Sequence, residues 1–361
     1  MTRRLFLSRA GAAAAAGATL AAPAIAQSLP AVRWRLTSSY PKSLDTVYGG
    51  GEQLADRVRK LTDGKFDIRV FAAGEIVPGL QALDAVQNNS VECCHTNSYY
   101  YIGKNMSFGF ETALPFGLTT RQHNAWMYYG GGMELLRDFY KEYGVMNFPG
   151  GNTGTQMGGW FRTPFKTLSD LKGLKIRIPG LGGQVWLRMG AVPQNIPGGD
   201  IYPALERGTI DATEWIGPYD DEKLGFYKIA KHYYTPGWWE PSSQFSYFVN
   251  TAEWNKLPKP YQEAFAVAAA EVNLNMMAEY DAKNPVALKR LISNGVTLHR
   301  YPTDILKAAM KISLDMYEEE ATNNAGFRKI YASWKKARED GYAWFAIAEQ
   351  GYEGFAYSNK V

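Results

Sequence analysis

An arginine set between two isoleucines is the residue whose surroundings most clearly demand a chemical partner. Arg177 lies in the stretch LKGLKIRIPG, residues 171–180, where a short apolar run ends at a Pro-Gly pair. Such a run predicts a strand buried between layers, and an unpaired guanidinium is too costly to keep there. Two partners are open: a carboxylate of the same chain beside an edge strand, or a small carboxylate ligand held through two parallel charge-assisted bonds, which lysine forms less well.

Glu214 and Trp215 close a second predicted strand, in the stretch DATEW. Because this strand belongs to the same region as Arg177, we expect both residues to emerge near the arginine. Glu214 then has two possible roles: it pairs with Arg177, or it offers an oxygen to a hard cation together with the carboxamide of Gln156 and a backbone carbonyl. The roles are compatible, since a bound cation lets a carboxylate approach an anion without net repulsion.

Two further polar side chains stand in aromatic stretches, Tyr100 in NSYYYIG and Glu240 in GWWEP. Aromatic residues in such stretches belong more often to the core than to a ligand wall. Tyr100, however, follows the end of a predicted strand, where a cleft wall is expected, and its hydroxyl is able to reach a keto or carboxylate oxygen of a ligand there. Glu240 lies in a segment that crosses back between two halves of the chain, and we expect it to face the same cleft.

Signatures of common enzyme classes are missing from the sequence. It has no phosphate loop ending in Lys-Ser/Thr, no serine nucleophile elbow, no paired-histidine metalloprotease motif and no Cys-x-x-Cys. Cys93 and Cys94 are adjacent on a predicted strand, which favours small buried residues without a redox role. The acidic stretch PYDDEK, residues 218–223, lacks the spacing of a calcium loop and predicts a solvated charge run. No metal-ligand spacing links the four histidines to one another or to a cysteine: His95, His123, His232 and His299.

The first 26 residues have a basic start, an Ala-rich apolar middle and a small-x-small end, which predict an export signal. The stretch TRRLFL, with Arg3 and Arg4, resembles the twin-arginine type, so we expect a periplasmic protein that begins at Gln27. Removing Arg3, Arg4 and Arg9 takes the net charge from +4 to 4 − 3 = +1, which leaves no basic field suited to nucleic acid. No later segment has the roughly 18 uninterrupted apolar residues of a membrane span.

The elements that must position these residues alternate between strands and helices. Residues 32–96 predict β-α-β-α-β, a second α/β unit contains Arg177, and residues 242–250 predict a strand that returns to the first unit. The predicted fold class is α/β, a two-lobed periplasmic binding protein (clamshell) with a mostly parallel, helix-flanked sheet in each lobe and long C-terminal helices. Because the chain crosses twice between the two lobes, we expect a cleft between them at the carboxyl ends of the strands. The predicted boundaries are 1–26 for the signal, 27–152 plus about 243–282 for lobe 1, 153–242 plus about 283–325 for lobe 2, and 326–361 for a C-terminal helix.

The stretches DLKGLKIRIPG and YPALERGTIDATEW together resemble the solute receptors of tripartite ATP-independent periplasmic (TRAP) transporters. The resemblance covers essentially the whole mature chain, including ADRVRKLTDGKFDIRVFAAGEI. It implies that Arg177 binds the carboxylate of a solute. The Glu-Trp pair resembles the branch of alpha-keto acid receptors and their lactate-binding relatives, in which the solute and the protein together hold a cation. That branch implies cation contacts from Gln156, Glu214, the carbonyl of Trp215 and Glu240. Sialic-acid-binding members have Asn where this chain has Trp215, which disfavours a bulky sugar acid.

The sequence and the resemblance together predict a receptor that binds a small 2-oxo monocarboxylate such as pyruvate, with Tyr100 beside it, and performs no chemistry. The expected cation is sodium, with calcium as the alternative, and the expected partners are the TRAP membrane subunits. Three competing interpretations stay open: a calcium-dependent lactate receptor, a sensory receptor, and a periplasmic lyase or isomerase that uses Glu214 as a base.

The C-terminal segment carries more apolar side chains than a terminal helix normally leaves bare. Relatives of this branch form dimers by exchanging a long helix, so the resemblance implies a homodimer. The alternative is packing of the segment onto its own lobes. The residues concerned are Phe327, Ile330, Tyr331, Trp334, Trp344, Phe345 and Ile347.

Overall fold

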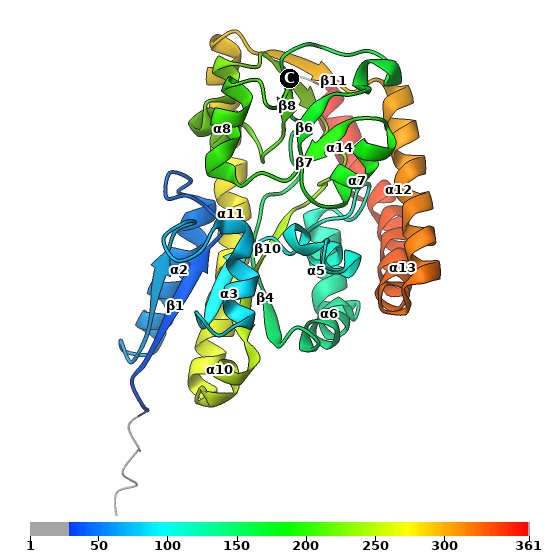
Figure 1. Ribbon diagram of the computed structural model, residues 1–361. Helices are drawn as coiled ribbons and strands as arrows, with labels where there is room; N and C mark the ends of the chain where they lie inside the picture. Colours follow the sequence, from blue (N-terminus) through cyan, green and yellow to red (C-terminus); the bar gives the residue numbers. More distant parts are fainter. Residues whose placement is uncertain (1–28, 360–361) are drawn as a thin grey trace, which may run out of the picture. The chain divides into compact units, whose positions relative to one another are not determined.

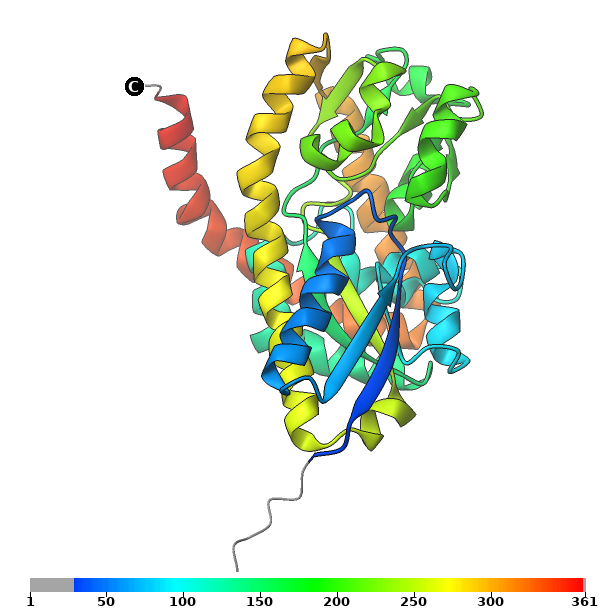
Figure 2. The same cartoon turned by 90° about the vertical axis from the view of Figure 1, so that its left-hand side faces the viewer.

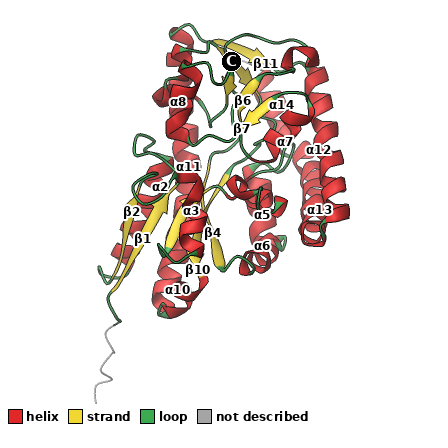
Figure 3. Ribbon diagram, viewed as in Figure 1, coloured by secondary structure: helices red, strands yellow, loops and turns green. Residues whose placement is uncertain are grey.

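The computed structural model describes residues 29–359, which contain two mixed β-sheets with helices packed beside them (Figures 1 and 3). The predicted signal, residues 1–26, lies outside the described residues. The first sheet has the order β2-β1-β3-β10-β4. Its strands are β1 (Val32–Ser38), β2 (Phe66–Phe71), β3 (Cys93–Thr96), β4 (Val145–Asn152) and β10 (Gln244–Asn250).

Strand β10 is the returning strand that the sequence predicts, and it is inserted between β3 and β4. It runs antiparallel to both neighbours, whereas β1 runs parallel to β2 and β3. The alternation of side chains along β1 explains its place in the sheet: Trp34 and Leu36 are buried, and Arg35 between them faces solvent. The first sheet is therefore mixed, because the chain leaves this half and comes back.

The second sheet has the order β11-β9-β5-β8-β6-β7. Its strands are β5 (Trp160–Phe161), β6 (Lys175–Arg177), β7 (Val192–Gln194), β8 (Ala212–Thr213), β9 (His232–Thr235) and β11 (Thr297–Arg300). Strand β6 pairs in parallel with β8 on one side and β7 on the other, with Arg177 opposite Thr213 and Gln194. Arg177 therefore ends an inner strand of the sheet and not an edge strand.

Long helices follow the two sheets in the second half of the chain. Helix α11 contacts β4 and α2 of the first half and α9 of the second, and Figure 2 shows it, in yellow, running past both. Among the described helices, none combines the length and the apolar character needed to cross a membrane. The α-helices are α2 (Val47–Leu61), α3 (Ala82–Gln87), α4 (Gly109–Thr112), α5 (Thr120–Tyr129), α6 (Gly132–Lys141), α7 (Gly180–Arg188), α8 (Gly198–Glu206), α9 (Pro218–Leu224), α10 (Thr251–Lys256), α11 (Lys259–Ser293), α12 (Thr303–Asn323), α13 (Ala325–Ile347) and α14 (Glu349–Ser358).

The prediction for residues 218–223 is wrong. Instead of a solvated charge run, they form most of α9, in which Asp220 and Asp221 are both buried. The reason is tertiary structure: Trp160, Tyr233 and Tyr280, which lie 12 to 61 positions away in the sequence, donate hydrogen bonds to the two carboxylates, and composition gives no sign of these contacts. Cys93 and Cys94, in contrast, are free and buried as predicted.

The C-terminal segment divides into a packed part and an exposed part. The side chains of Phe327, Tyr331 and Trp334 are buried in the core of the same chain. Beyond them Trp344 is 60% exposed, and α14 contains no buried residue within its ten described positions. In Figure 2 the red α14 stands apart from the other helices. The first half of the segment therefore packs on its own chain, whereas α14 buries no described side chain and is joined to the rest by the ion pair of Glu349 with Arg121.

Candidate functional site

Arg177 is buried, with 1% of its side chain exposed, at the end of β6. Its Nη1 forms an ion pair with Glu214 and donates to the Glu214 carbonyl at 3.2 Å, while its Nε donates to the Ile196 carbonyl at 3.0 Å. Its Nη2 has no hydrogen-bond partner among residues 29–359. Burial disfavours the charged guanidinium, but Glu214 outweighs this effect, so the pKa of Arg177 stays above its ordinary value. The arginine thus has an intrachain partner and one free nitrogen.

Glu214 and Trp215 follow β8 directly and meet Arg177, as the sequence predicts. The guanidinium carbon lies 5.0 Å from the centre of the Trp215 ring, within cation–π range. The same ring lies against Gly198, where an added Cβ would come within 2.6 Å of it. Burial raises the pKa of the Glu214 carboxyl well above its usual range, and Arg177 opposes that rise. Arg177, Glu214 and Trp215 therefore form one packed cluster.

Gln156 and Glu240 lie on the two segments that cross between the halves of the chain. The Gln156 amide donates to the Glu240 carbonyl at 3.1 Å, and the Met157 amide donates to the Ile216 carbonyl at 3.0 Å. These bonds bring both crossings beside Trp215. Burial raises the pKa of Glu240 to about 7. The four residues predicted to hold a cation are thus gathered from three separate stretches of sequence.

The oxygens of this cluster suit a hard cation. Within the described part of the chain, Gln156 Oε1, Glu214 Oε2 and both carboxylate oxygens of Glu240 are buried without a hydrogen-bond partner. Buried acceptors are normally satisfied, and carboxylate and carboxamide oxygens are the ligands that sodium and calcium prefer. Residues 29–359 contain no cluster of three or more His, Cys, Asp or Glu side chains arranged for a metal, so any cation here needs Gln156 or a backbone carbonyl in addition.

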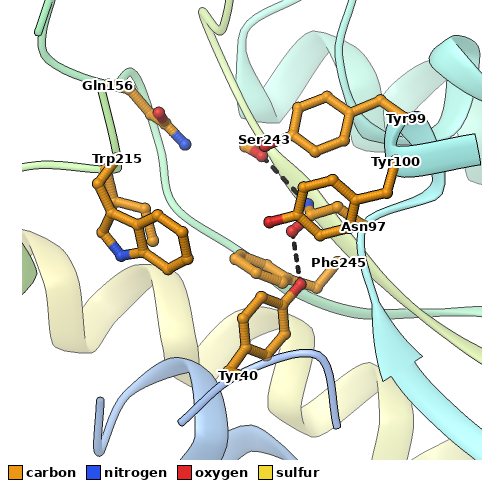
Figure 4. Close-up of a pocket in the computed structure, with 9 residues that line it drawn as sticks. Tyr40, Asn97, Tyr99, Tyr100, Gln156, Trp215, Ser243 and Phe245 are labelled. Carbon is orange, nitrogen blue, oxygen red and sulfur yellow. Dashed lines mark hydrogen bonds between the residues drawn. The ribbon is translucent and has the colours of Figure 1, made fainter. Parts of the chain in front are cut away.

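A small pocket lies beside this cluster (Figure 4). Its empty volume is about 200 Å³, a figure that includes space open to solvent. In Figure 4 the carboxamide of Gln156 points into the pocket, opposite the rings of Tyr99 and Tyr100. The residues that line it are Tyr40, Asn97, Tyr99, Tyr100, Gln156, Trp215, Ile216, Ser243 and Phe245.

The first-sheet side of the pocket is internally hydrogen-bonded. The Tyr40 hydroxyl donates to the Asn97 side chain, whose amide donates to the Ser243 hydroxyl at 3.4 Å. Gly180, at the Pro-Gly stop after β6, has a φ of +65° and leaves no room for a Cβ against the Tyr99 ring, which would lie 2.7 Å away. Glycine at this turn therefore lets the second half of the chain approach the first.

Tyr100 lies close enough to Arg177 for the two to interact electrostatically. Burial raises the pKa of Tyr100 to about 12, and the positive charge of Arg177 opposes the rise. The phenol therefore keeps its proton at neutral pH and is able to donate a hydrogen bond. Tyr100, Gln156 and Trp215 line the pocket itself, whereas Arg177, Glu214 and Glu240 are buried near it without being part of its lining.

Four lining residues were not singled out from the sequence: Tyr40, Asn97, Ser243 and Phe245. Tyr40 comes two residues after the end of β1, and Asn97 directly follows β3. Because ligands bind outside the carboxyl ends of parallel strands, this position identifies both. Ser243 and Phe245 lie at the start of antiparallel β10, where the rule gives no signal.

The fold and the site together define a class of protein. The chain forms two mixed sheets, and the segments that cross between them gather buried, unpaired polar groups beside a small pocket. This arrangement is that of a two-lobed solute-binding protein.

Comparison with known proteins agrees with this class. The chain matches the family described as bacterial extracellular solute-binding protein, family 7, over residues 37–323. It is 54% identical over 332 residues to the monocarboxylate 2-oxoacid-binding periplasmic protein of Nostoc sp., covering 92% of this chain and 91% of that protein.

Solved structures give the same result. The fold matches a TRAP transporter solute-binding protein from Bordetella bronchiseptica with a TM-score of 0.90 at 51% identity, covering 91% of this chain and 98% of that one. That structure is a mixed-occupancy dimer, with copurified calcium and picolinate bound in one active site and the other site apo. It also matches a TRAP periplasmic solute-binding protein from Pseudoalteromonas atlantica, solved with bound sodium and pyruvate, with a TM-score of 0.86 at 39% identity over 89% of this chain and 98% of that one.

The chain belongs to the family 7 extracellular solute-binding proteins of TRAP transporters. The predicted membership in the TRAP solute receptors and the predicted two-lobed α/β class are therefore confirmed, with the refinement that both sheets are mixed. Members of the family are periplasmic solute receptors and not enzymes, which excludes the interpretation as a lyase or isomerase.

Proposed function

We propose that this protein binds a small 2-oxo monocarboxylate, with pyruvate as the reference solute, together with a bound cation, and delivers it to a TRAP membrane complex. The observation that carries the proposal is the set of buried polar atoms without partners among the described residues: Arg177 Nη2 and the oxygens of Gln156, Glu214 and Glu240. A carboxylate satisfies the guanidinium, and a cation satisfies the oxygens. The relatives that bind 2-oxo acids, and pyruvate with sodium, support this choice.

Each residue has a distinct role in this proposal. Arg177 holds the solute carboxylate through its free Nη2, while Nη1 stays on Glu214. Gln156, Glu214, Glu240 and the Trp215 carbonyl hold the cation, which supplies strong contacts to the solute oxygens without requiring a larger solute. This matters because pyruvate has few atoms, and even the best small ligands gain at most about 1.5 kcal/mol per heavy atom.

The solute and the cation are tested together by isothermal titration of pyruvate, 2-oxobutyrate and lactate, each with sodium and then calcium, and with succinate as a dicarboxylate control. We expect the two 2-oxo acids to bind tightly, lactate less tightly, and succinate not at all. Preferential binding of lactate with calcium identifies the protein as a lactate receptor of the same family. If the titrations show no binding of any of the three monocarboxylates, the solute assignment is wrong.

The exposed part of the C-terminal segment supports a second proposal, that a second copy of this chain covers α14. Its large apolar side chains are exposed: Ile347 77%, Tyr352 73%, Phe355 73% and Tyr357 74%. The relative from Bordetella bronchiseptica, which is 51% identical, forms a dimer. Light scattering after chromatography is expected to give a dimer for the full chain and a monomer for a chain ending at Ala348. A full-length monomer contradicts the proposal.

Export through the twin-arginine pathway is likewise a proposal, supported by Arg3 and Arg4 in TRRLFL. Replacing both arginines with lysine is expected to leave precursor in the cytoplasm, while the same change at Arg9 is expected to leave export intact. Fractionation and immunoblotting distinguish these outcomes. Normal export of the double variant contradicts the assignment of the pathway.

A further inference from the structure

The buried carboxylate of Asp221, in α9, accepts hydrogen bonds from three groups. Trp160 Nε1 donates to its Oδ2 at 2.8 Å, the Tyr233 hydroxyl donates to the same oxygen at 2.6 Å, and the Ile216 amide donates to its Oδ1 at 3.2 Å. Trp160 and Tyr233 stack with ring centres 3.9 Å apart on neighbouring strands of the second sheet. Asp221 therefore connects the rigid sheet with the peptide bond that joins Trp215 to Ile216.

That peptide bond lies beyond the last residue of β8, Thr213, so strand pairing does not hold it. In a trans peptide the N–H and the C=O point in opposite directions. Because the Ile216 N–H points at Asp221, the Trp215 carbonyl oxygen points away from it. The next carbonyl, of Ile216, is in turn bonded by the Met157 amide at 3.0 Å, which ties this loop to the crossing that carries Gln156.

We propose that Asp221 is a positioning residue of the solute site, which holds the Trp215–Ile216 peptide so that the Trp215 carbonyl oxygen faces the cation. This inference rests on the proposed function, in which that carbonyl is a cation ligand. A carboxylate suits the role because it accepts from all three donors without presenting a hydrogen of its own. Outer groups of this kind orient the groups that touch a metal, and their loss typically weakens metal binding about 10- to 100-fold.

The variant Asp221→Asn tests the role with almost no change of shape. Trp160 Nε1 and the Ile216 amide are both donors only, and a carboxamide has one oxygen. Whichever donor faces the new NH₂ group loses its acceptor, so the indole and the peptide compete for the remaining oxygen. The matched control is Tyr233→Phe, which removes one bond from the same carboxylate and leaves the Ile216 bond in place.

The experiment measures how much calcium is needed for half-maximal pyruvate binding by full-length protein, with thermal denaturation alongside. We expect Asp221→Asn to raise the calcium requirement about tenfold, while saturating calcium restores most of the pyruvate affinity. Tyr233→Phe is expected to lower the melting temperature and leave the calcium requirement within about threefold of wild type. An unchanged calcium requirement in Asp221→Asn, or equal shifts in both variants, overturns the positioning role.

Failure of the proposed function is visible separately, because it appears in the wild type as an absence of pyruvate binding, and this inference then falls with it. If Asp221→Asn does not fold, a crystal structure of the wild type with calcium and pyruvate decides. A Trp215 carbonyl within about 2.3–2.6 Å of the ion, with the Ile216–Asp221 bond intact, supports the role. An ion that does not touch this carbonyl contradicts it.

Discussion

The two walls of the pocket differ in how completely their polar groups are satisfied. On the first-sheet wall, the side chains of Tyr40, Asn97 and Ser243 bond one another. The second wall consists of Gln156 and Trp215, which line the pocket, and of the residues buried behind them, Arg177, Glu214 and Glu240. Here Gln156, Arg177, Glu214 and Glu240 each keep a polar atom without a partner among the described residues. A folded chain satisfies nearly all such atoms. Under the proposed function, the first wall is complete in the protein alone, and the second is completed by the solute and the cation.

The same contrast separates the ion pair of the site from those on the surface. Arg35 and Glu92, for example, are joined by two side-chain bonds in a largely exposed setting, where a pair contributes little. Arg177 and Glu214 are 1% and 0% exposed, and a pair at that depth must be compensated by further bonds. Under the proposed function, those further bonds form at the unpaired atoms of both partners, Arg177 Nη2 and Glu214 Oε2.

The largest loss of pyruvate affinity is expected from replacing Arg177 in the second wall. Arg177→Ala is expected to weaken pyruvate binding roughly a hundredfold or more, because truncating one member of a buried hydrogen-bonded charge pair costs about 2–5 kcal/mol. It also leaves Glu214 without its cationic partner, so we expect a lower unfolding temperature. Arg177→Lys is the matched variant: it keeps the charge beside Glu214 but lacks the second Nη. Calorimetry and thermal denaturation measure both effects, and near-normal binding by Arg177→Ala contradicts the account.

Protonation affects the second wall through Glu240, because burial raises its pKa to about 7. A proton therefore competes with the cation below that pH. We expect the cation affinity to be about tenfold lower at pH 6 than at pH 8, since a group with this pKa is mostly protonated at the lower pH. Glu240→Gln is expected to weaken cation binding at both values and to flatten the dependence on pH. Titrations at the two pH values test this, and a wild-type affinity that does not change with pH is inconsistent with it.

The stability of the cation-free protein is expected to change with pH in the opposite direction. The raised pKa means that, between about pH 4.5 and 7, folded Glu240 holds a proton that the unfolded chain has released. The unfolding free energy therefore falls as the pH rises through this window. Added calcium is expected to raise the melting temperature more at pH 8 than at pH 6, because the ion replaces the missing proton.

The first wall is expected to tolerate change better. Tyr100→Phe removes one hydroxyl from the pocket and is expected to lower pyruvate affinity about three- to tenfold, the range of a single hydrogen bond. Tyr101→Phe is the control, because the Tyr101 hydroxyl accepts from the Leu83 amide at 3.1 Å and does not line the pocket. We expect this control to lose stability and to keep its affinity. Equal losses of affinity in both variants would remove the distinction.

The smallest effect is expected where the walls meet at the rim. Asp45, in the loop that also carries Tyr40, accepts from the Tyr219 hydroxyl at 2.9 Å and forms an ion pair with Lys223 of α9. Its side chain is 54% exposed, so the contact is screened by salt. Asp45→Asn is expected to lower pyruvate affinity two- to threefold in dilute buffer and to match wild type in 1 M salt. A large loss that persists in salt points to a different role.

Most helices and strands could be predicted from the sequence because side-chain alternation and stop residues are signals within each element. The alternation around Trp34 and Leu36 predicts β1, and Arg177 with its Pro-Gly stop predicts the end of β6. Buried Asp220 and Asp221 were mispredicted because the side chains that donate to them lie on β5, β9 and α11, between 12 and 61 positions away in the sequence, and local composition gives no sign of these contacts. The strand β11 was also missed, and Phe245 was not singled out because it lies on an antiparallel strand, where the strand-end rule gives no signal.

The candidate site was predicted in part. Glu214 emerges beside Arg177 because both follow adjacent strands of one sheet, a relation that strand order makes foreseeable. That Arg177 pairs with Glu214 and still keeps a free Nη2 depends on side-chain geometry, which no sequence pattern encodes. The roles of these residues toward a solute remain predictions.

The central claim, that the second wall is completed by an acid and a cation together, is tested most directly by calorimetric titration of pyruvate into protein freed of cations by a chelator, and again after calcium or sodium is restored. We predict that removing the cation weakens pyruvate binding about a hundredfold, the upper range of coupling between two ligands, and that restoring it recovers full affinity. Equal affinity with and without the cation contradicts the claim.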